Sequence, residues 1–331
     1  MKAKLIFLFI KKISIKKILN FIKIFLSYWI SVILKKTYRW GMPYSISVEI
    51  SNYCNLNCPQ CPVGNGTLSR KKGNMNFKTF KRIIDQTHQY LLNCFLYFQG
   101  EPFLNPLLPK MIEYAHKKHI FTATATNGHF LSEKNAKKIV LSGLDYIIIS
   151  LDGLTQQTYQ IYRKNGNIQT VINGIKNLVN AKKKLNRTNP FIEVQTLLMS
   201  TNEHEIKKLQ KFVYQLGVDN FKIKSMQIYD FKKYAYLLPK NQKYNRYKKI
   251  NGVWQRRKKI KNRCWRLWNS AVITWDGKLL PCCFDKNAKY YFGYVNSENL
   301  KNLLRNDKFK KFAKQVLKNR SKIDICRNCT E

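Results

Sequence analysis

The 331-residue sequence is short of acidic side chains: 18 Asp and Glu stand against 61 Lys and Arg, a formal net charge of +43. Such an imbalance ordinarily indicates a nucleic acid or an anionic membrane as partner. The lysines are spread over both halves of the chain, which is also rich in Asn, Ile, Tyr and Phe. A chain-wide bias in composition therefore explains the charge as well as a binding patch would. Nucleic-acid binding is therefore not expected. Because 44% of the residues are hydrophobic, a disordered chain is excluded.

The apolar N-terminal segment also lacks a long uncharged run and a cleavage signal. Its longest uncharged stretch, Ile24 to Leu34, has eleven residues, whereas a bilayer span needs about 20. No small-residue cleavage site follows the apolar residues 5–10. We therefore expect a cytoplasmic protein.

In residues 1–36, polar side chains recur every three or four positions, which predicts an amphipathic helix. They are Lys12, Lys16, Asn20, Lys23, Ser27, Ser31 and Lys35. One interpretation places the helix in the inner membrane interface, with lysines near the lipid phosphates. The other packs it on the protein's own barrel or on a partner. The sequence leaves both open.

Histidine is scarce, with five residues, but cysteine is not: the chain has nine, of which eight fall in two groups. Without a secretory signal, metal ligation in a reducing cytoplasm explains the thiols better than disulfides. In the first group, Cys54, Cys58 and Cys61 lie within eight residues and no histidine is near. A tetrahedral zinc needs a fourth ligand. Three thiolates on a [4Fe-4S] core instead leave one iron open.

From Tyr44 onward, β-branched runs alternate with helical patterns, which predicts βα units and a parallel sheet. The predicted strands are 45–50, 95–99, 121–125, 146–151, 192–199 and 221–228, and the helices between them include 77–91, 106–119 and 203–216. Six units favour an α/β fold with a partial (β/α)6 TIM-like barrel, whose ligands bind beyond the carboxyl ends of the strands.

Composition also predicts the division of the chain. We expect an amphipathic helical segment over 1–43, the barrel over 44–229, a Lys-, Tyr- and Asn-rich connector over 230–262 and a small α+β cysteine-rich domain over 263–331. In the last part, Asp276-Gly277 between 271–275 and 278–281 predicts a hairpin. Short helices are expected near Leu300 and Phe309.

The loop Cys54-Asn-Leu-Asn-Cys58-Pro-Gln-Cys61 after a first strand resembles the signature of the radical S-adenosylmethionine superfamily. Three turns at the expected strand ends strengthen the resemblance: Gly100-Glu101-Pro102, Thr126-Asn127-Gly128 and Ser150-Leu151-Asp152-Gly153. The resemblance covers residues 45–228. It implies a [4Fe-4S] cluster, S-adenosylmethionine (SAM) and an electron donor such as flavodoxin or ferredoxin.

The same resemblance implies the cofactor-binding residues. The Gly100-Glu101 turn receives the methionine amino group, which suits a carboxylate because an ammonium donates charge-assisted hydrogen bonds. Ser150 matches the position near the ribose and carboxylate, Arg163 the arginine that pairs with the carboxylate, and Gln60 a residue beside the adenine. Asn127 and Asp152 belong to the remaining matching turns and complete the predicted set.

The second group consists of Cys264, Cys282, Cys283, Cys326 and Cys329. Its spacing resembles the SPASM and shorter twitch extensions of the superfamily, and five cysteines fit the form with one auxiliary [4Fe-4S] cluster. The resemblance implies Cys264, Cys282, Cys326 and Cys329 as ligands. Cys283 could be the ligand in place of Cys282. A four-cysteine zinc site remains an alternative to the cluster.

These features predict a radical SAM oxidoreductase in which a 5′-deoxyadenosyl radical abstracts hydrogen and the auxiliary cluster accepts an electron. The spacing resembles that of aminocyclitol alcohol dehydrogenases of the superfamily, so a sugar-like or other small-molecule alcohol is the expected substrate. No peptide-binding segment is recognised before the barrel, yet peptide or protein modification stays an alternative. A non-catalytic iron-sulfur or zinc protein that binds nucleic acid is the alternative of another class. The catalytic base is not assigned.

Overall fold

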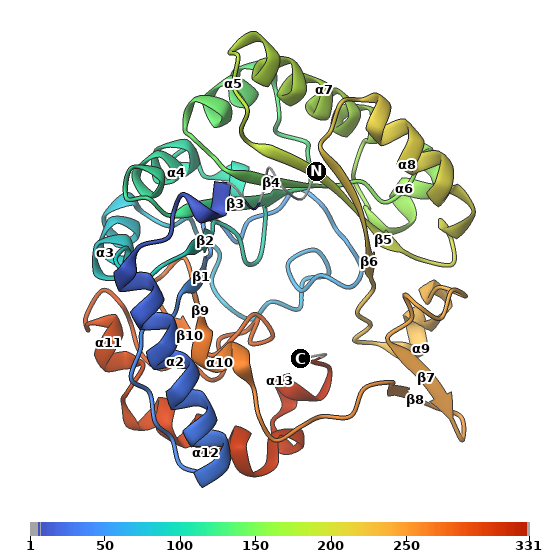
Figure 1. Cartoon of the computed structure of the whole chain (residues 1–331). Helices are drawn as coiled ribbons and strands as arrows, with labels where there is room; N and C mark the ends of the chain where they lie inside the picture. Colours follow the sequence, from blue (N-terminus) through green and yellow to red (C-terminus); the bar gives the residue numbers. More distant parts are fainter. Residues whose placement is uncertain (1–5, 7, 330–331) are drawn as a thin grey trace. The chain divides into compact units, whose positions relative to one another are not determined.

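The computed structural model describes residues 6 and 8–329. It is an α/β protein whose eight-stranded sheet has the order β10-β9-β1-β2-β3-β4-β5-β6 (Figure 1). All neighbouring pairs described within it are parallel except β9 and β10. The α/β class and the partial TIM-like barrel are thereby confirmed. By compactness the chain divides into two units, which interleave in sequence.

The first unit comprises residues 54–68 and 124–259. Its elements are α5 (Glu133–Leu141), β4 (Tyr146–Ser150), α6 (Gln156–Tyr162), α7 (Ile168–Lys184), β5 (Phe191–Leu198), η2 (Glu203–Glu205), α8 (Ile206–Gln215), β6 (Asn220–Ser225), α9 (Phe231–Tyr234), η3 (Ala235–Leu237), β7 (Tyr247–Ile250) and β8 (Val253–Arg256). The antiparallel pair β7 and β8 lies in the predicted connector. It was missed because its exposed lysines and arginine hide the alternation typical of a strand.

The second unit comprises the described parts of 2–53, 69–123 and 260–331. Its elements are α2 (Ile15–Leu34), β1 (Ser45–Val48), α3 (Phe77–Thr87), β2 (Asn93–Phe95), η1 (Pro102–Leu104), α4 (Leu108–Lys117), β3 (Phe121–Thr126, ending in the first unit), α10 (Trp265–Asn269), β9 (Ser270–Ile273), β10 (Leu279–Leu280), α11 (Leu300–Leu303), α12 (Asp307–Asn319), η4 (Arg320–Lys322) and α13 (Asp324–Arg327).

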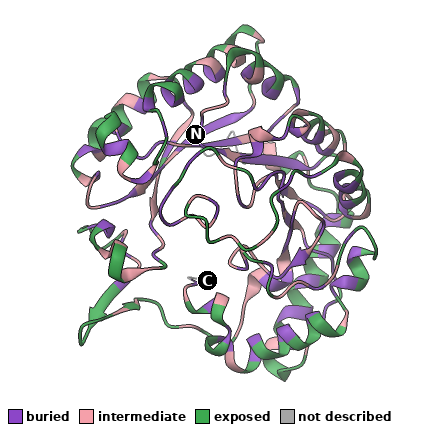
Figure 2. Ribbon diagram, turned by 180° about the vertical axis from the view of Figure 1, so that it is seen from behind, coloured by how far each residue is buried: buried purple, intermediate pink, exposed green. Residues whose placement is uncertain are grey.

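Local sequence explains where the helices begin. The side chains of Asn76, Ser132, Thr155, Asn167 and Asn306 each accept a hydrogen bond from the backbone N–H three residues later. These caps satisfy donors that the first helical turn leaves unpaired. Most residues of strands β3, β4 and β5 are buried, whereas the outer faces of the helices are exposed (Figure 2).

The predicted hairpin after Trp275 is confirmed, with Gly277 at a φ of +90° and its N–H donating to the carbonyl of Thr274. The structure adds what the sequence did not indicate: β9 pairs in parallel with β1, from Ser45 opposite Ser270 to Val48 opposite Ile273. The cysteine-rich segment therefore extends the sheet from which the first cysteine loop emerges. The predicted strand 95–99 was misplaced, because β2 is Asn93–Phe95.

Candidate functional site

The first cysteine loop, residues 54–61, belongs to the first unit. Cys58 is buried and Cys54 and Cys61 are half-buried. The N–H of Cys61 donates to the carbonyl of Cys58, and the N–H of Leu56 lies 3.4 Å from the Cys54 sulfur. A Cβ on Gly64 would come within 2.5 Å of the Cys58 nitrogen, so only glycine permits this close turn.

Two polar side chains approach the sulfurs of this loop. Nη1 of Arg163 lies 3.8 Å from the Cys58 sulfur, and Nδ2 of Asn127 lies 3.8 Å from that of Cys54. Burial raises the pKa of the Cys58 thiol, while the Arg163 charge acts in the opposite direction. Donors directed at sulfur stabilise a thiolate, the form that binds iron. The loop thus fits an iron-sulfur cluster chemically.

Arg163 is held in place by an ion pair. Its Nε donates to Oδ2 of Asp152 at 2.5 Å, and Oδ1 of Asp152 accepts from the N–H of Leu197 at 2.7 Å. The Asp152 side chain is fully buried. Asp152 follows β4, at whose last residue lies Ser150, half-buried and opposite Gln195 of β5. The structure therefore brings Arg163 to Asp152, and the predicted contact with a methionine carboxylate stays a prediction.

Gln60 and Asn127 are also oriented by hydrogen bonds. Oε1 of Gln60 accepts from the N–H of Tyr229 at 2.7 Å, and Nδ2 of Asn127 donates to Oδ1 of Asn55 at 2.7 Å. His129, which no motif in the sequence indicated, has Nδ1 3.1 Å from Oδ1 of Asn127. A histidine two residues after a predicted ligand was the only signal for this contact.

The Gly100-Glu101 turn lies in the second unit. Gly100 has a φ of +74°, and a Cβ there would meet the carbonyl oxygens of Ser51 and Tyr53 at 2.6 Å. The N–H of Glu101 donates to the Tyr53 carbonyl at 2.7 Å, and the Glu101 carboxylate accepts from the N–H of Phe103. The turn thus packs on the residues that directly precede Cys54, and only glycine fits there without a clash.

Four of the five C-terminal cysteines line one small cavity in the second unit. They are Cys264, Cys282, Cys326 and Cys329, and Arg266 and Arg320 line the same cavity. In the described chain, 6 and 8–329, no three Cys, His, Asp or Glu side chains lie close enough to hold a single metal ion. The ligand set therefore stays a prediction, although its four thiols suit a cluster.

Two arginines contact cysteine sulfurs in this group. Nη2 of the buried Arg320 lies 3.2 Å from the Cys329 sulfur, and Nη1 of Arg266 lies 3.2 Å from that of Cys283. Burial raises the pKa of Cys326 to about 11, while Arg320 lowers it. Both arginines were missed because the sequence has 61 basic residues and their positions carry no distinguishing spacing.

Cys283 and Cys94 lie elsewhere. Cys283 does not line the cavity and packs against a small apolar cluster that includes Val272 and Leu280. Cys94 is fully buried in β2. Neighbours on an extended chain point in opposite directions, which is why the resemblance-based set leaves Cys283 out.

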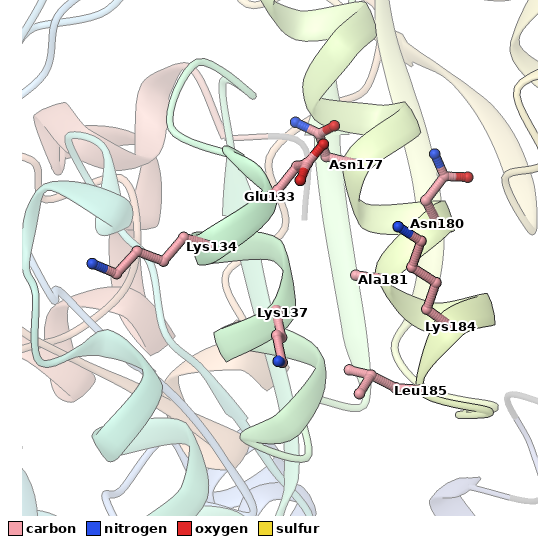
Figure 3. A pocket seen from close by; sticks show the side chains of 8 residues that line it. All are labelled: Glu133, Lys134, Lys137, Asn177, Asn180, Ala181, Lys184 and Leu185. Carbon is pink, nitrogen blue, oxygen red and sulfur yellow. The ribbon is translucent and has the colours of Figure 1, made fainter.

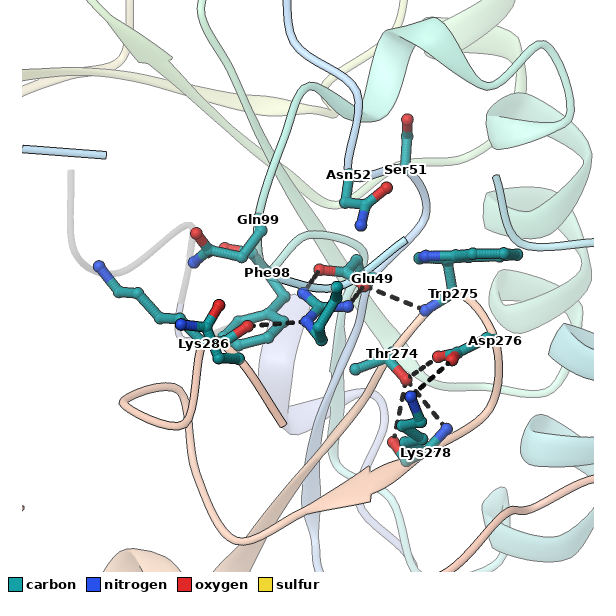
Figure 4. A network of polar contacts seen from close by, with 12 residues as sticks. Glu49, Ser51, Asn52, Phe98, Gln99, Thr274, Trp275, Asp276, Lys278 and Lys286 are labelled. Carbon is teal, nitrogen blue, oxygen red and sulfur yellow. Dashed lines mark hydrogen bonds and ion pairs between the residues drawn. The ribbon is translucent and has the colours of Figure 1, made fainter. Parts of the chain in front are cut away.

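A buried ion pair anchors the loop that follows Cys282. Both oxygens of the fully buried Glu49 accept from Arg70, at 2.8 and 2.6 Å, and Nε of Arg70 donates to the carbonyl of Lys286. The N–H of Trp275 also donates to Glu49 (Figure 4). Burial raises the pKa of the Glu49 carboxyl, and Arg70 opposes that shift. The pair ties the end of β1 to the C-terminal segment.

A separate groove of about 630 Å³ lies between α5 and α7 (Figure 3). Lys134 and Lys137 contribute from α5 and Lys184 from α7. None of the predicted site residues lines it. We therefore assign the groove no part in the chemistry of the cysteine sites.

Comparison with known families agrees with these features. The model of the radical SAM superfamily matches residues 48–213, and the SPASM model, an iron-sulfur cluster-binding domain, matches residues 264–330. The chain belongs to the radical SAM superfamily and carries a C-terminal SPASM domain. Its cofactors are accordingly a SAM-binding [4Fe-4S] cluster, SAM and an auxiliary iron-sulfur cluster.

Among individual relatives, the tungsten-containing aldehyde ferredoxin oxidoreductase cofactor-modifying protein of Pyrococcus furiosus is 24% identical over 79% of this chain and 81% of its own. Mycofactocin maturase MftC of Mycobacterium tuberculosis is 26% identical over 42% of this chain and 35% of its own. The chain thus spans most of one relative and about a third of the other.

Two solved structures share the fold at low identity. BtrN in complex with AdoMet and 2-DOIA has a TM-score of 0.53 and 19% identity, covering 88% of this chain and 94% of BtrN. Streptococcus suis SuiB bound to precursor peptide SuiA has a TM-score of 0.62 and 14% identity, covering 87% of this chain and 71% of SuiB. At these identities the likeness shows the fold alone.

Proposed function

We propose that this radical SAM enzyme dehydrogenates a small-molecule alcohol, such as a sugar-like polyol, and that its C-terminal site accepts an electron from the substrate. The observation that carries the proposal is the ring of Cys264, Cys282, Cys326 and Cys329 around one cavity. Four thiolates coordinate every iron of a [4Fe-4S] cluster, so no iron is left to bind substrate. Such a site is suited to electron transfer.

When bound, the first cluster and SAM supply a 5′-deoxyadenosyl radical that removes one hydrogen atom from the substrate. The chain's residues then have separate roles. The Glu101 carboxylate would accept hydrogen bonds from the methionine ammonium, and Gln60 would lie beside the adenine. Arg163 is held by Asp152 and donates toward the Cys58 sulfur. It would orient the methionine carboxylate.

The oxidation balances as the loss of two hydrogens. The carbinol carbon would give a hydrogen atom to the radical, which becomes 5′-deoxyadenosine. The hydroxyl proton would leave to a base, and one electron would leave to the C-terminal site. The product is a ketone or aldehyde. Arg320 supports this role because a buried positive charge beside thiolates favours the site that gains the electron.

The test uses the full chain, reconstituted with iron and sulfide without oxygen, and polyols and aminocyclitols deuterated at the carbinol carbons. We expect deuterium in 5′-deoxyadenosine together with an equal amount of carbonyl product. If 5′-deoxyadenosine forms but stays unlabelled with every alcohol, alcohols are not the substrate class. The radical chemistry of the family would still hold. Metal analysis separates the alternatives at the second site: about eight irons per chain support two clusters, and about four irons with one zinc support a zinc site.

Peptide modification is the second candidate, supported by the relatives. MftC is a maturase, and SuiB and anSMEcpe, the latter with a TM-score of 0.58 and 18% identity, were solved with peptides bound. A Cα-deuterated or Cβ-deuterated peptide that labels 5′-deoxyadenosine, when no alcohol does, would select this function.

A further inference from the structure

Helix α2 packs on the protein through its polar side. Its buried residues are Lys17, Asn20, Ile24, Ser27, Tyr28 and Ser31. Asn20 exchanges two hydrogen bonds of 2.8 Å with the backbone of Met42. The Ser31 hydroxyl accepts from the N–H of Tyr38 at 2.9 Å and donates to the carbonyl of Ser27 at 2.6 Å. These contacts hold the helix along the second unit.

The opposite side of α2 is apolar and exposed. Ten of its twenty residues are large hydrophobic side chains exposed by 37–76%: Ile15, Ile18, Leu19, Phe21, Ile22, Phe25, Leu26, Trp29, Ile33 and Leu34. We call these ten residues the α2 apolar face. A surface helix in water normally has the reverse arrangement, with its apolar side toward the core. A contiguous apolar surface of this kind marks an interaction site.

The charges within the N-terminal segment that carries the α2 apolar face are all of one sign. The sequence contains no Asp or Glu before Glu49. Exposed lysines lie on the helix and at its ends, at Lys11, Lys16, Lys23, Lys35 and Lys36. The occupant of this surface must therefore be apolar in the middle and anionic at the edges. A bilayer of anionic lipids has this chemistry.

We propose that α2 lies flat in the interface of an anionic lipid bilayer, with its apolar face among the acyl chains and its lysines beside the headgroup phosphates. By length and composition the helix is also able to cross a membrane. The contacts of Asn20 and Ser31 argue for the flat position, because a crossing helix would have to give them up. A second copy of the chain fits less well, since a symmetric contact would bring the same lysines together.

The experiment is flotation of the full, cluster-loaded chain with vesicles of phosphatidylcholine alone or mixed with phosphatidylglycerol. Deleting residues 1–36 would remove the buried Ile24 and Tyr28, so substitutions are preferable. We expect Ile22→Gln/Leu26→Gln/Ile33→Gln to bind mixed vesicles about tenfold more weakly. Lys16→Gln/Lys23→Gln should lose about tenfold on mixed vesicles and little on phosphatidylcholine.

The matched control is Leu141→Gln/Val253→Gln, which changes apolar side chains of 53% and 60% exposure outside α2. It should bind vesicles like the unchanged chain. All variants should cleave SAM at the unchanged rate, which shows that they fold. The proposal is overturned if the full chain does not float with mixed vesicles, or if the triple variant floats equally. A lipid-free dimer in sedimentation velocity that the triple variant abolishes, without vesicle binding, would instead identify a second copy as the occupant.

Discussion

The two cysteine groups of this protein differ in the number of thiols and in what surrounds them. The first has three cysteines in one short loop, with Arg163 and Asn127 directed at two of the sulfurs. The second has five cysteines, of which four line one cavity although they are distant in sequence, and Nη2 of Arg320 lies 3.2 Å from the Cys329 sulfur. Three thiols leave one iron open to a cofactor, whereas four leave none.

This difference separates two chemical tasks. In the function we propose, the first site would bind and activate SAM through its open iron, and the second would exchange electrons. The following predictions test that separation from the largest expected effect to the smallest.

The largest effect is expected for Cys58→Ala. Losing one of three ligands should remove the first cluster and lower SAM cleavage by more than about 1000-fold, because that cluster supplies the electron for cleavage. Iron should fall by about four per chain, and the remaining iron should keep the spectrum of the auxiliary site. Cleavage above a few per cent would show that Cys58 is not a ligand.

Cys282→Ala should spare the first site and affect the second. We expect product to fall by about 100-fold while SAM cleavage without product continues within a few-fold. The matched control is Cys283→Ala, because Cys283 lies outside the cavity. If Cys283→Ala loses iron and Cys282→Ala does not, the ligand assignment is reversed.

Gly100→Ala tests the turn that packs on Ser51 and Tyr53. An added Cβ would meet two backbone carbonyls at 2.6 Å at a φ of +74°, so we expect a loss of about 2–3 kcal/mol in unfolding free energy and weaker SAM binding. Gly66→Ala is the control: its φ is +77° but no atom lies within 4 Å. It should cost about 1 kcal/mol and leave SAM binding unchanged. Equal losses in the two variants would mean that strain, and not the contact, limits Gly100.

Arg320→Gln should have the smallest effect. Removing a buried positive charge beside Cys329 should lower the midpoint potential of the auxiliary cluster by about 60 mV, a factor of ten for one electron. Arg320→Lys should retain most of the potential. Redox titration followed by electron paramagnetic resonance measures this without turnover, and the first cluster serves as the internal control. If the midpoint potential is unchanged in Arg320→Gln, the charge of Arg320 does not tune the cluster, and the residue only packs.

Much of the fold followed from the sequence because each βα unit is encoded locally. Strands β3, β4 and β5 begin within one residue of the predicted positions, since their β-branched runs are bounded by turns. Strand β2 was misplaced because the apolar run 95–99 continues past the last ladder pair, at Phe95. The pair β7 and β8 was missed because few of its side chains are buried.

The sequence predicted more of the first candidate site than of the second. The spacing of Cys54, Cys58 and Cys61 predicts an iron-sulfur cluster, because three thiols within eight residues can converge on one inorganic core. Arg320 and Arg266 could not be found, because an arginine acquires its role from the sulfur that folding brings to it.

The sequence by itself determined the class of the protein, its cofactors and the existence of an N-terminal amphipathic helix, because cysteine spacing and side-chain periodicity are local properties. The tertiary structure decided that β9 joins β1, that four of five cysteines share a cavity, and that α2 turns its polar side inward. These depend on partners distant in the chain: the backbone of Met42 and Tyr38 pairs with Asn20 and Ser31, and only that pairing determines which side of the helix remains exposed.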